Sequence, residues 1–175
     1  MKINTKITSF IALFITLIMI GSLFYGIMGG VNYNATSTTS EPQKLVTFNV
    51  FFSNSKKSDG IDCSLVYPVQ RVLQVPENFI SQEELALWVL LAGPSEEELK
   101  DGYYTNINQG VKINNFKIDK GVAYVDFDKT LEEGLAGSCL VTAVRSQIEQ
   151  TLKQFPEIKE VHISIEQHSE DILQP

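Results

Sequence analysis

Apolar and polar residues follow a clear order in the second half of the chain. Val122–Phe127 alternates and is rich in β-branched and aromatic residues, which predicts a strand with one buried face. After Gly137 and Ser138, which offer an N-cap, apolar residues recur at helical spacing until Pro156 forbids continuation. Residues 161–165 then alternate again, which predicts a returning strand. The apolar positions of the helix are Val141, Val144, Ile148, Leu152 and Phe155.

Two strands and a hairpin are predicted ahead of this unit. Residues 45–52 and 65–73 have strand character, and Pro68 places the second of these strands at a sheet edge or bulge because proline cannot donate to a ladder. Residues 112–118 form a further strand. The tripeptide 119–121 supplies a glycine where a hairpin loop needs positive φ, so this strand and the one that follows should pair as a hairpin.

Serine caps predict where the earlier helices begin. Ser81 and Glu84 form a capping box, and Gly93-Pro94 ends the helix that they start. Ser95 caps a second short helical turn, in which the carboxylates of Glu96–Glu98 are expected to be solvated rather than a cation site. The apolar stripe of the first helix is predicted to be Leu85, Trp88, Val89 and Ala92.

These elements predict an α+β fold in a single domain at 45–167. The order is strand, strand, helix, hairpin, helix, strand, with the helices packed on a small, mostly antiparallel sheet. A polar tail at 168–175 carries one apolar pair, Ile172 and Leu173, that can dock on the domain. The aromatic residues expected in the core are Phe48, Phe52, Trp88, Phe116 and Phe127.

The N-terminal segment has the composition of a membrane helix. Residues 7–28 are almost wholly apolar, and their apolar run would span about 28 Å as a helix, close to the bilayer hydrocarbon thickness. A cleaved signal peptide is the alternative, since hydropathy separates the two poorly. The lysines of residues 1–6 place this end in the cytoplasm by the positive-inside rule. Residues 29–44 read as a flexible linker.

Charge and topology together predict an extracytoplasmic domain on a single-pass cell-membrane anchor. The chain has a net charge of −7, and its first forty residues contain two lysines and no acid, so the domain itself is still more acidic. Such a surface repels phosphate backbones, which argues against nucleic-acid binding.

The two cysteines admit two interpretations. Cys63 and Cys139 lack zinc-ligand spacing and can form one disulfide in an outward-facing domain. Alternatively, Cys139 in the first turn of a helix would have a lowered pKa and could act as a nucleophile with His162 or His168 as base. No thiol-enzyme signature surrounds Cys139, so the chain is predicted not to be an enzyme.

A small-ligand site is the other alternative function. The backbone amides after Gly137 and Ser138 resemble an anion site at a helix N-terminus, and Arg71 could assist if its strand lies nearby. Ordinary capping by Ser138 and an arginine packed on the sheet explain the same residues without a ligand. Asp126 and Asp128 share one strand face but lack a third ligand, so a solvated strand end is expected, with no metal and no cofactor.

Three phrases in fixed order resemble the GerMN domain of sporulation and germination proteins. They are residues 91–98 (LAGPSEEE), residues 121–127 (GVAYVDF), and the Gly-Ser before a long helix that ends at residues 154–159 (QFPEIK). The resemblance covers about 46–166, one copy of the domain.

The resemblance implies an extracytoplasmic, non-enzymatic α+β module, similar in shape to the ring-building domains of secretion and sporulation machinery. It implies a role as a scaffold that contacts other envelope proteins, and it offers no catalytic residues to carry over.

Overall fold

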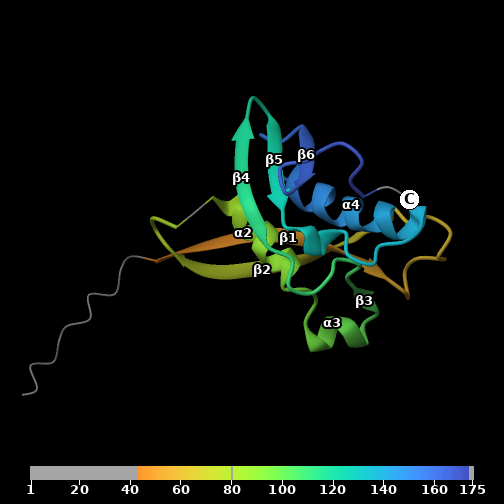
Figure 1. Cartoon of the computed structure of the whole chain (residues 1–175). Coiled ribbons are helices and arrows are strands. Elements are labelled where there is room, and N and C mark those ends of the chain that lie inside the picture. Colours follow the sequence, from red (N-terminus) through yellow and green to blue (C-terminus); the bar gives the residue numbers. More distant parts are fainter. Residues whose placement is uncertain (1–42, 80, 174–175) are drawn as a thin grey trace, which may run out of the picture. The chain divides into compact units, whose positions relative to one another are not determined.

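The strands and helices follow the predicted order, with a short strand β3 and a 3-10 helix added (Figure 1). The computed structural model describes residues 43–79 and 81–173, so the predicted membrane helix at 7–28 and nearly all of the linker lie outside the described residues. In chain order the elements are β1 (Gln43–Asn54), β2 (Tyr67–Pro76), α2 (Gln82–Leu91), α3 (Glu96–Lys100), β3 (Tyr103–Tyr104), β4 (Ile113–Asp119), β5 (Val122–Phe127), η1 (Lys129–Leu131), α4 (Ser138–Lys153) and β6 (Glu160–Ile165).

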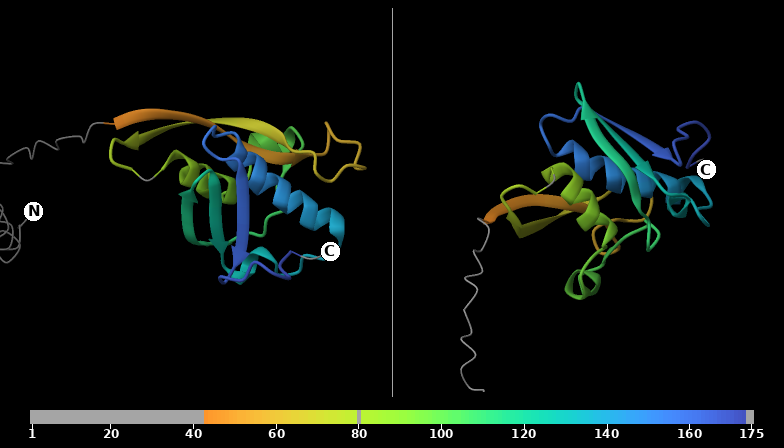
Figure 2. Two further views of the ribbon diagram at one scale, coloured as in Figure 1. Left: turned by 90° about the horizontal axis from the view of Figure 1, so that it is seen from above. Right: turned by 60° about the vertical axis from the view of Figure 1, so that its left-hand side comes forward.

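The α+β class is confirmed, but the strands form two three-stranded sheets instead of one. Their orders are β2-β1-β3 and β4-β5-β6, and every pairing is antiparallel except the parallel pair β5–β6. Helix α4 packs against both β1 and β6, and α2 packs against β1 and α4 (Figures 1 and 2). Thr151 of α4 and Gln154, just after it, hydrogen-bond the β1 backbone at Phe51 and Asn49.

The predicted core face of α4 is confirmed, whereas that of α2 is half right: Leu85 and Val89 pack against the core, but Trp88 and Ala92 are exposed. All five apolar positions predicted for α4 and the chain just after it are buried, as are Phe48, Phe52 and Phe127, and Phe116 packs against this core. Trp88 is instead 44% exposed. Helix α2 turns Ala86, Leu87 and Leu90 inward; it is apolar on nearly every side, so periodicity could not select its face.

Local turn and cap signals were read with two errors. The β4–β5 turn places Lys120 and Gly121 at φ 50° and 86°, as a two-residue hairpin loop requires. The Ser81 and Ser95 hydroxyls cap α2 and α3, but the reciprocal capping box predicted for Ser81 and Glu84 is found at Ser95 and Glu98 instead. Ser138 is not a cap, because Gly137 holds the N-cap position and no side chain bonds the first turn of α4.

Both ends of the described chain are part of the domain. β1 begins at Gln43, so Lys44 belongs to the strand rather than the linker. In the tail, Ile172 and Leu173 are buried, which confirms that this apolar pair docks, and Arg145 donates to the Ile172 carbonyl at 3.2 Å. No helix within residues 43–79 and 81–173 is long and apolar enough to cross a membrane.

Candidate functional site

Helix α4 and strand β3 cover one edge of β1. The Asn49 amide donates to Gln154 Oε1 at 2.7 Å, and Gln154 Nε2 donates to the Asn49 carbonyl at 2.6 Å. The Phe51 amide donates to Thr151 Oγ1 at 3.1 Å, and from Ser53 onward the strand pairs with β3. The backbone is therefore satisfied along this edge without another long strand.

The opposite edge of this sheet, on β2, is open. Asn49 stands opposite Gln70, and because both backbone groups of Asn49 bond to Gln154, this is a non-hydrogen-bonded pair of the antiparallel ladder. The backbone N–H and C=O groups of Gln70, Val72 and Gln74 therefore point away from β1. Among the described strands, none pairs with this edge.

Two prolines bound the open stretch. Pro68 lies opposite Phe51 and Pro76 opposite Gln43, so both occupy the outward-pointing set of positions. A proline is tolerated there because the missing N–H would have faced solvent. The prediction that Pro68 marks an edge strand is confirmed, and free donors remain only between the two prolines.

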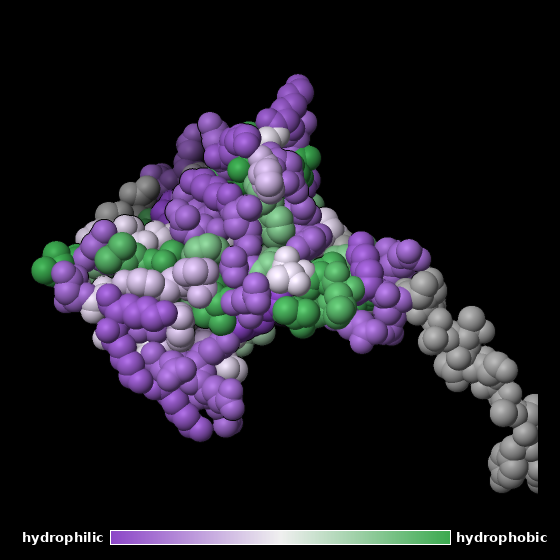
Figure 3. All heavy atoms as spheres, turned by 180° about the vertical axis from the view of Figure 1, so that it is seen from behind, coloured by the Kyte–Doolittle hydropathy of each residue, from purple (hydrophilic) through white to green (hydrophobic). Residues whose placement is uncertain are grey.

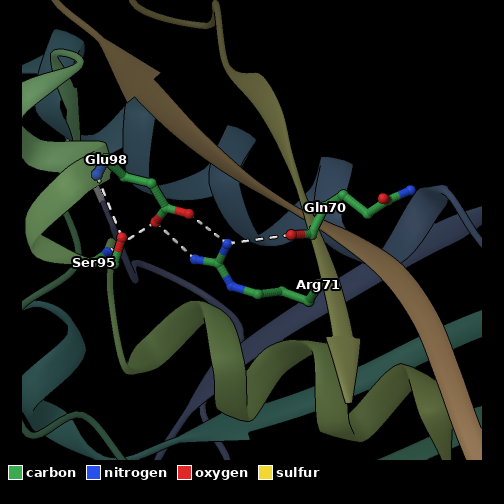
Figure 4. A network of polar contacts seen from close by, with 4 residues as sticks. All are labelled: Gln70, Arg71, Ser95 and Glu98. Carbon is green, nitrogen blue, oxygen red and sulfur yellow. Dashed lines mark hydrogen bonds and ion pairs between the residues drawn. The ribbon is translucent and has the colours of Figure 1, made fainter.

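Arg71, the only charged residue of β2, is neutralised within the domain. Its guanidinium bonds both carboxylate oxygens of Glu98 at 2.6 and 2.8 Å, and a 3.4 Å contact reaches the Gln70 carbonyl (Figure 4). The Glu98 carboxylate also accepts the Ser95 amide at 2.8 Å. These bonds, the Arg71 bonds first, hold the pKa of Glu98 below its usual range. Glu98 is therefore not the freely solvated acid that was predicted.

Arg71 and the start of α4 do not form a common site. Gly137 lines a hollow of about 260 Å³ beside the disulfide, but neither Ser138 nor Arg71 lines it. Because Arg71 already holds a carboxylate, the structure brings no free cation to the α4 N-terminus from β2. Of the three residues predicted as a joint anion site, Gly137 and Ser138 are neighbours at the start of α4, and Arg71 is paired with Glu98.

The cysteines are bonded to each other. Cys63 and Cys139 form a disulfide with a Cα separation of 5.2 Å. The interpretation of Cys139 as a nucleophile is therefore wrong for this state of the protein, because its sulfur carries no free thiol. Of its suggested bases, His162 is exposed beside Tyr124, with ring centroids 5.5 Å apart, and His168 contacts the backbone of its own turn.

Asp126 is not the solvated strand end that was predicted. It is 8% exposed, and its carboxylate accepts hydrogen bonds from Ser164 at 2.6 Å, the Gln167 amide at 2.7 Å and Asn114 at 3.2 Å. Burial opposes ionisation, but these bonds outweigh it and hold the pKa of Asp126 below its usual range. Within the described ranges, no group of three or more His, Cys, Asp or Glu could hold a metal ion.

The sequence interpretation missed the polar stripe of α4. Gln147 and Thr151 are fully buried, and Gln147 accepts from Thr105 at 2.9 Å while contacting Ser53 at 3.4 Å. Together with Gln154, these residues lie at helical spacing next to the apolar stripe. That spacing was a readable signal that α4 faces polar backbone as well as a hydrophobic core.

The fold is a small disulfide-linked α+β domain in which β2 is the outer strand of its sheet. The chain belongs to the Germane family, described as sporulation and spore germination, because the family model matches residues 49–171. A comparison with curated proteins finds no match.

A solved structure of tandem GerMN domains shows the same fold. The chain is similar to the tandem GerMN domains of the sporulation protein GerM from Bacillus subtilis, with 22% identity and a TM-score of 0.52 over 73% of this chain and 40% of that one. A structure of the first GerMN domain alone matches with 22% identity and a TM-score of 0.47, over 71% of this chain and 85% of that one. A putative lipoprotein from Clostridium perfringens matches with 17% identity and a TM-score of 0.44, over 71% of this chain and 76% of that one. The chain thus spans less than half of the tandem structure.

Proposed function

We propose that this protein is a non-enzymatic binding module of the cell envelope, and that it adds a strand of another envelope protein to the open edge of β2. The observation that carries the proposal is the contrast between the edges of one sheet. Natural proteins usually protect an exposed edge with charges, prolines or a covering element. Between Pro68 and Pro76, β2 carries no further proline, its single charge is paired with Glu98, and none of the described strands pairs with it.

Strand addition suits the chemistry of this edge. The Gln70 amide and the main-chain groups of Val72 and Gln74 would supply the hydrogen bonds, and the 56% exposed Val72 side chain would supply an apolar contact. Leu45, 72% exposed, lies on the same face of the sheet one pair away. Figure 3 shows hydrophobic surface near the start of β1.

The anchored, outward-facing location is part of the same proposal. The apolar residues 7–28 follow two lysines, and the domain is acidic with a disulfide, which suits a compartment outside the cytoplasm. Protease added to intact spheroplasts should digest the domain and leave a membrane-embedded N-terminal fragment. A soluble protein beginning near Asn32 would instead show a cleaved signal peptide.

Crosslinking in intact cells tests the strand-addition proposal. A photoreactive residue at position 74 should capture a defined envelope protein, and the same residue at position 150 should not, because Gln150 is an exposed glutamine on α4. Adding Val72→Pro should abolish the position-74 adduct, since it removes one outward donor while leaving the β1 ladder intact. Equal capture from positions 74 and 150, or capture that Val72→Pro leaves unchanged, contradicts the proposal.

A further inference from the structure

The outer face of the second sheet carries two polar rows that cross all three strands. The register aligns Lys117 of β4 with Tyr124 of β5 and His162 of β6. The next row on this face runs from the bulge in β4 to Asp126 of β5 and Ser164 of β6. The alternate residues of β5 and β6 are buried or partly buried on the other face, so this face is built for solvent or a ligand.

A hollow of about 560 Å³ lies over these rows. That volume falls within the range of small-molecule sites, about 300 to 1,000 Å³. A β-bulge between Ile113 and Asn115 allows two consecutive asparagines, Asn114 and Asn115, to line the hollow. Gln167 and Ser169 line it from the chain after β6.

The base of the hollow is a fixed polar network. The Asp126 carboxylate is buried and accepts hydrogen bonds from Ser164, Asn114 and the Gln167 amide, so these neighbours are held in place. The turn that delivers the Gln167 amide has Glu166 and Gln167 at φ 49° and 67°, a conformation costly for residues with side chains. Strain beside a pre-organised polar network is a recurrent feature of ligand sites.

An aromatic pair flanks this network. The Tyr124 and His162 rings lie 5.5 Å apart at 37°, and Lys117 Nζ lies 4.8 Å from the Tyr124 ring centroid. Rings of this kind present an apolar face beside a polar tip, so they can pack on C–H groups while neighbouring groups form hydrogen bonds. Because Lys117 Nζ lies over the Tyr124 ring, a ligand that packs on that face takes the place of the ammonium group.

The composition of the hollow selects a class of ligand. Amides and hydroxyls, which both donate and accept, outnumber charges: the lining includes one lysine, and the one carboxylate is already satisfied by the protein. A strongly anionic ligand would lack cations, and an apolar ligand would leave the amides without partners. Neutral, polyhydroxylated molecules match the combination of rings, amides and hydroxyls.

We infer that this hollow binds a neutral oligosaccharide, which packs on Tyr124 and His162 and exchanges hydrogen bonds with Asn114, Asn115 and Ser164. The site lies on the second sheet and uses none of the β2 edge residues. It is therefore independent of the protein-binding function proposed above.

Isothermal titration calorimetry of the full chain with tetra-N-acetylchitotetraose and with cellotetraose tests this site. At least one of the two sugars should bind, and Tyr124→Ala should weaken that binding at least tenfold, with a smaller loss for His162→Ala. Tyr104→Ala is the matched control, because Tyr104 is an exposed tyrosine of β3 outside this hollow, and it should bind as the wild type does. Equal thermal unfolding midpoints of the three variants show that each is folded.

Two results would overturn the inference: neither sugar binds at millimolar concentration, or Tyr124→Ala binds as tightly as Tyr104→Ala. If both sugars fail and inorganic phosphate binds at the hollow, the hollow is an anion site centred on Lys117. Because Val72→Pro lies outside the hollow, loss of crosslinking in that variant with sugar binding intact would separate the two sites.

Discussion

The two edges of the β2-β1-β3 sheet differ in whether their backbone groups have hydrogen-bond partners. On β1, side chains from two helices replace a neighbouring strand: Gln154 and Thr151 of α4 bond the backbone of Asn49 and Phe51, and Gln82 of α2 donates to the Thr47 carbonyl at 2.9 Å. On the outer edge of β2, the side chains of residues 43–79 and 81–173 make one comparable contact, from Arg71 to the Gln70 carbonyl. The backbone groups of the β1 edge, which faces the core, therefore already have partners, whereas those of the β2 edge face solvent and could pair with another strand.

Breaking the disulfide is expected to lower the free energy of unfolding more than any other change. The bond ties α4, the helix that covers β1, to the loop after β1. The cysteines are 76 residues apart. Closing a loop of that length stabilises by about 4.5 kcal/mol in the chain-entropy model. Cys63→Ser and Cys139→Ser should each lower the free energy of unfolding by a similar amount in urea. If Cys139→Ser abolishes function at an unchanged melting temperature while Cys63→Ser is harmless, Cys139 has a chemical role and the non-enzymatic account is wrong.

Proline substitutions at two adjacent positions of β2 distinguish an amide that bonds to β1 from an amide that points away from it. Leu73 stands in a hydrogen-bonded pair with Val46, so Leu73→Pro should cost at least about 3 kcal/mol. Val72→Pro, at an outward position like that of Pro68, should cost less than about 1 kcal/mol. Thermal unfolding of both variants checks this. Similar losses would mean that the Val72 amide already has a partner.

Replacing two glutamines, one on each edge of the sheet, should have different costs in stability. Gln154→Ala leaves the Asn49 amide and carbonyl without their partners in a partly buried place, which should cost about 1 to 3 kcal/mol. Gln74→Ala, on the exposed face of β2, should stay within about 0.5 kcal/mol of the wild type. Urea unfolding measures both values, and an equal cost would show that neither edge is specially protected.

Removing the Arg71–Glu98 ion pair should lower the free energy of unfolding by a small amount that depends on pH. The pKa of Glu98 is lowered in the folded protein, so its stabilisation is present above the ordinary glutamate pKa and is lost as the pH falls through the lowered value. Glu98→Gln should therefore cost about 1 kcal/mol at pH 7 and less at pH 3. Melting curves at the two pH values test it. A cost that is constant with pH would show that the ion pair contributes nothing.

The sequence correctly predicted the features that depend on residues close together in the chain. Alternation identified every strand of five or more residues, Pro68 identified the edge strand, and Ser95 and Gly121 identified a cap and a turn. Each of these signals acts through backbone geometry within a few residues of itself.

Tertiary pairing explains what could not be predicted. Trp88 was assigned to the core because α2 is apolar on nearly all sides, so its inward face depends on what it packs against. Arg71 and Glu98 lie 27 residues apart, and no local pattern joins them. The two-residue strand β3 exists only because β1 offers it an edge. The sites likewise arise where separate strands meet.

Amide hydrogen exchange of the full chain, alone and with the protein captured from position 74, tests the central claim most directly. In the free protein, the Asn49 and Phe51 amides should be protected, whereas those of Val72 and Gln74 should exchange rapidly. In the complex, Val72 and Gln74 should gain protection while Asn49 and Phe51 stay as they were. Protected Val72 and Gln74 amides in the free chain, or unchanged exchange in the complex, would contradict an open, partner-binding edge.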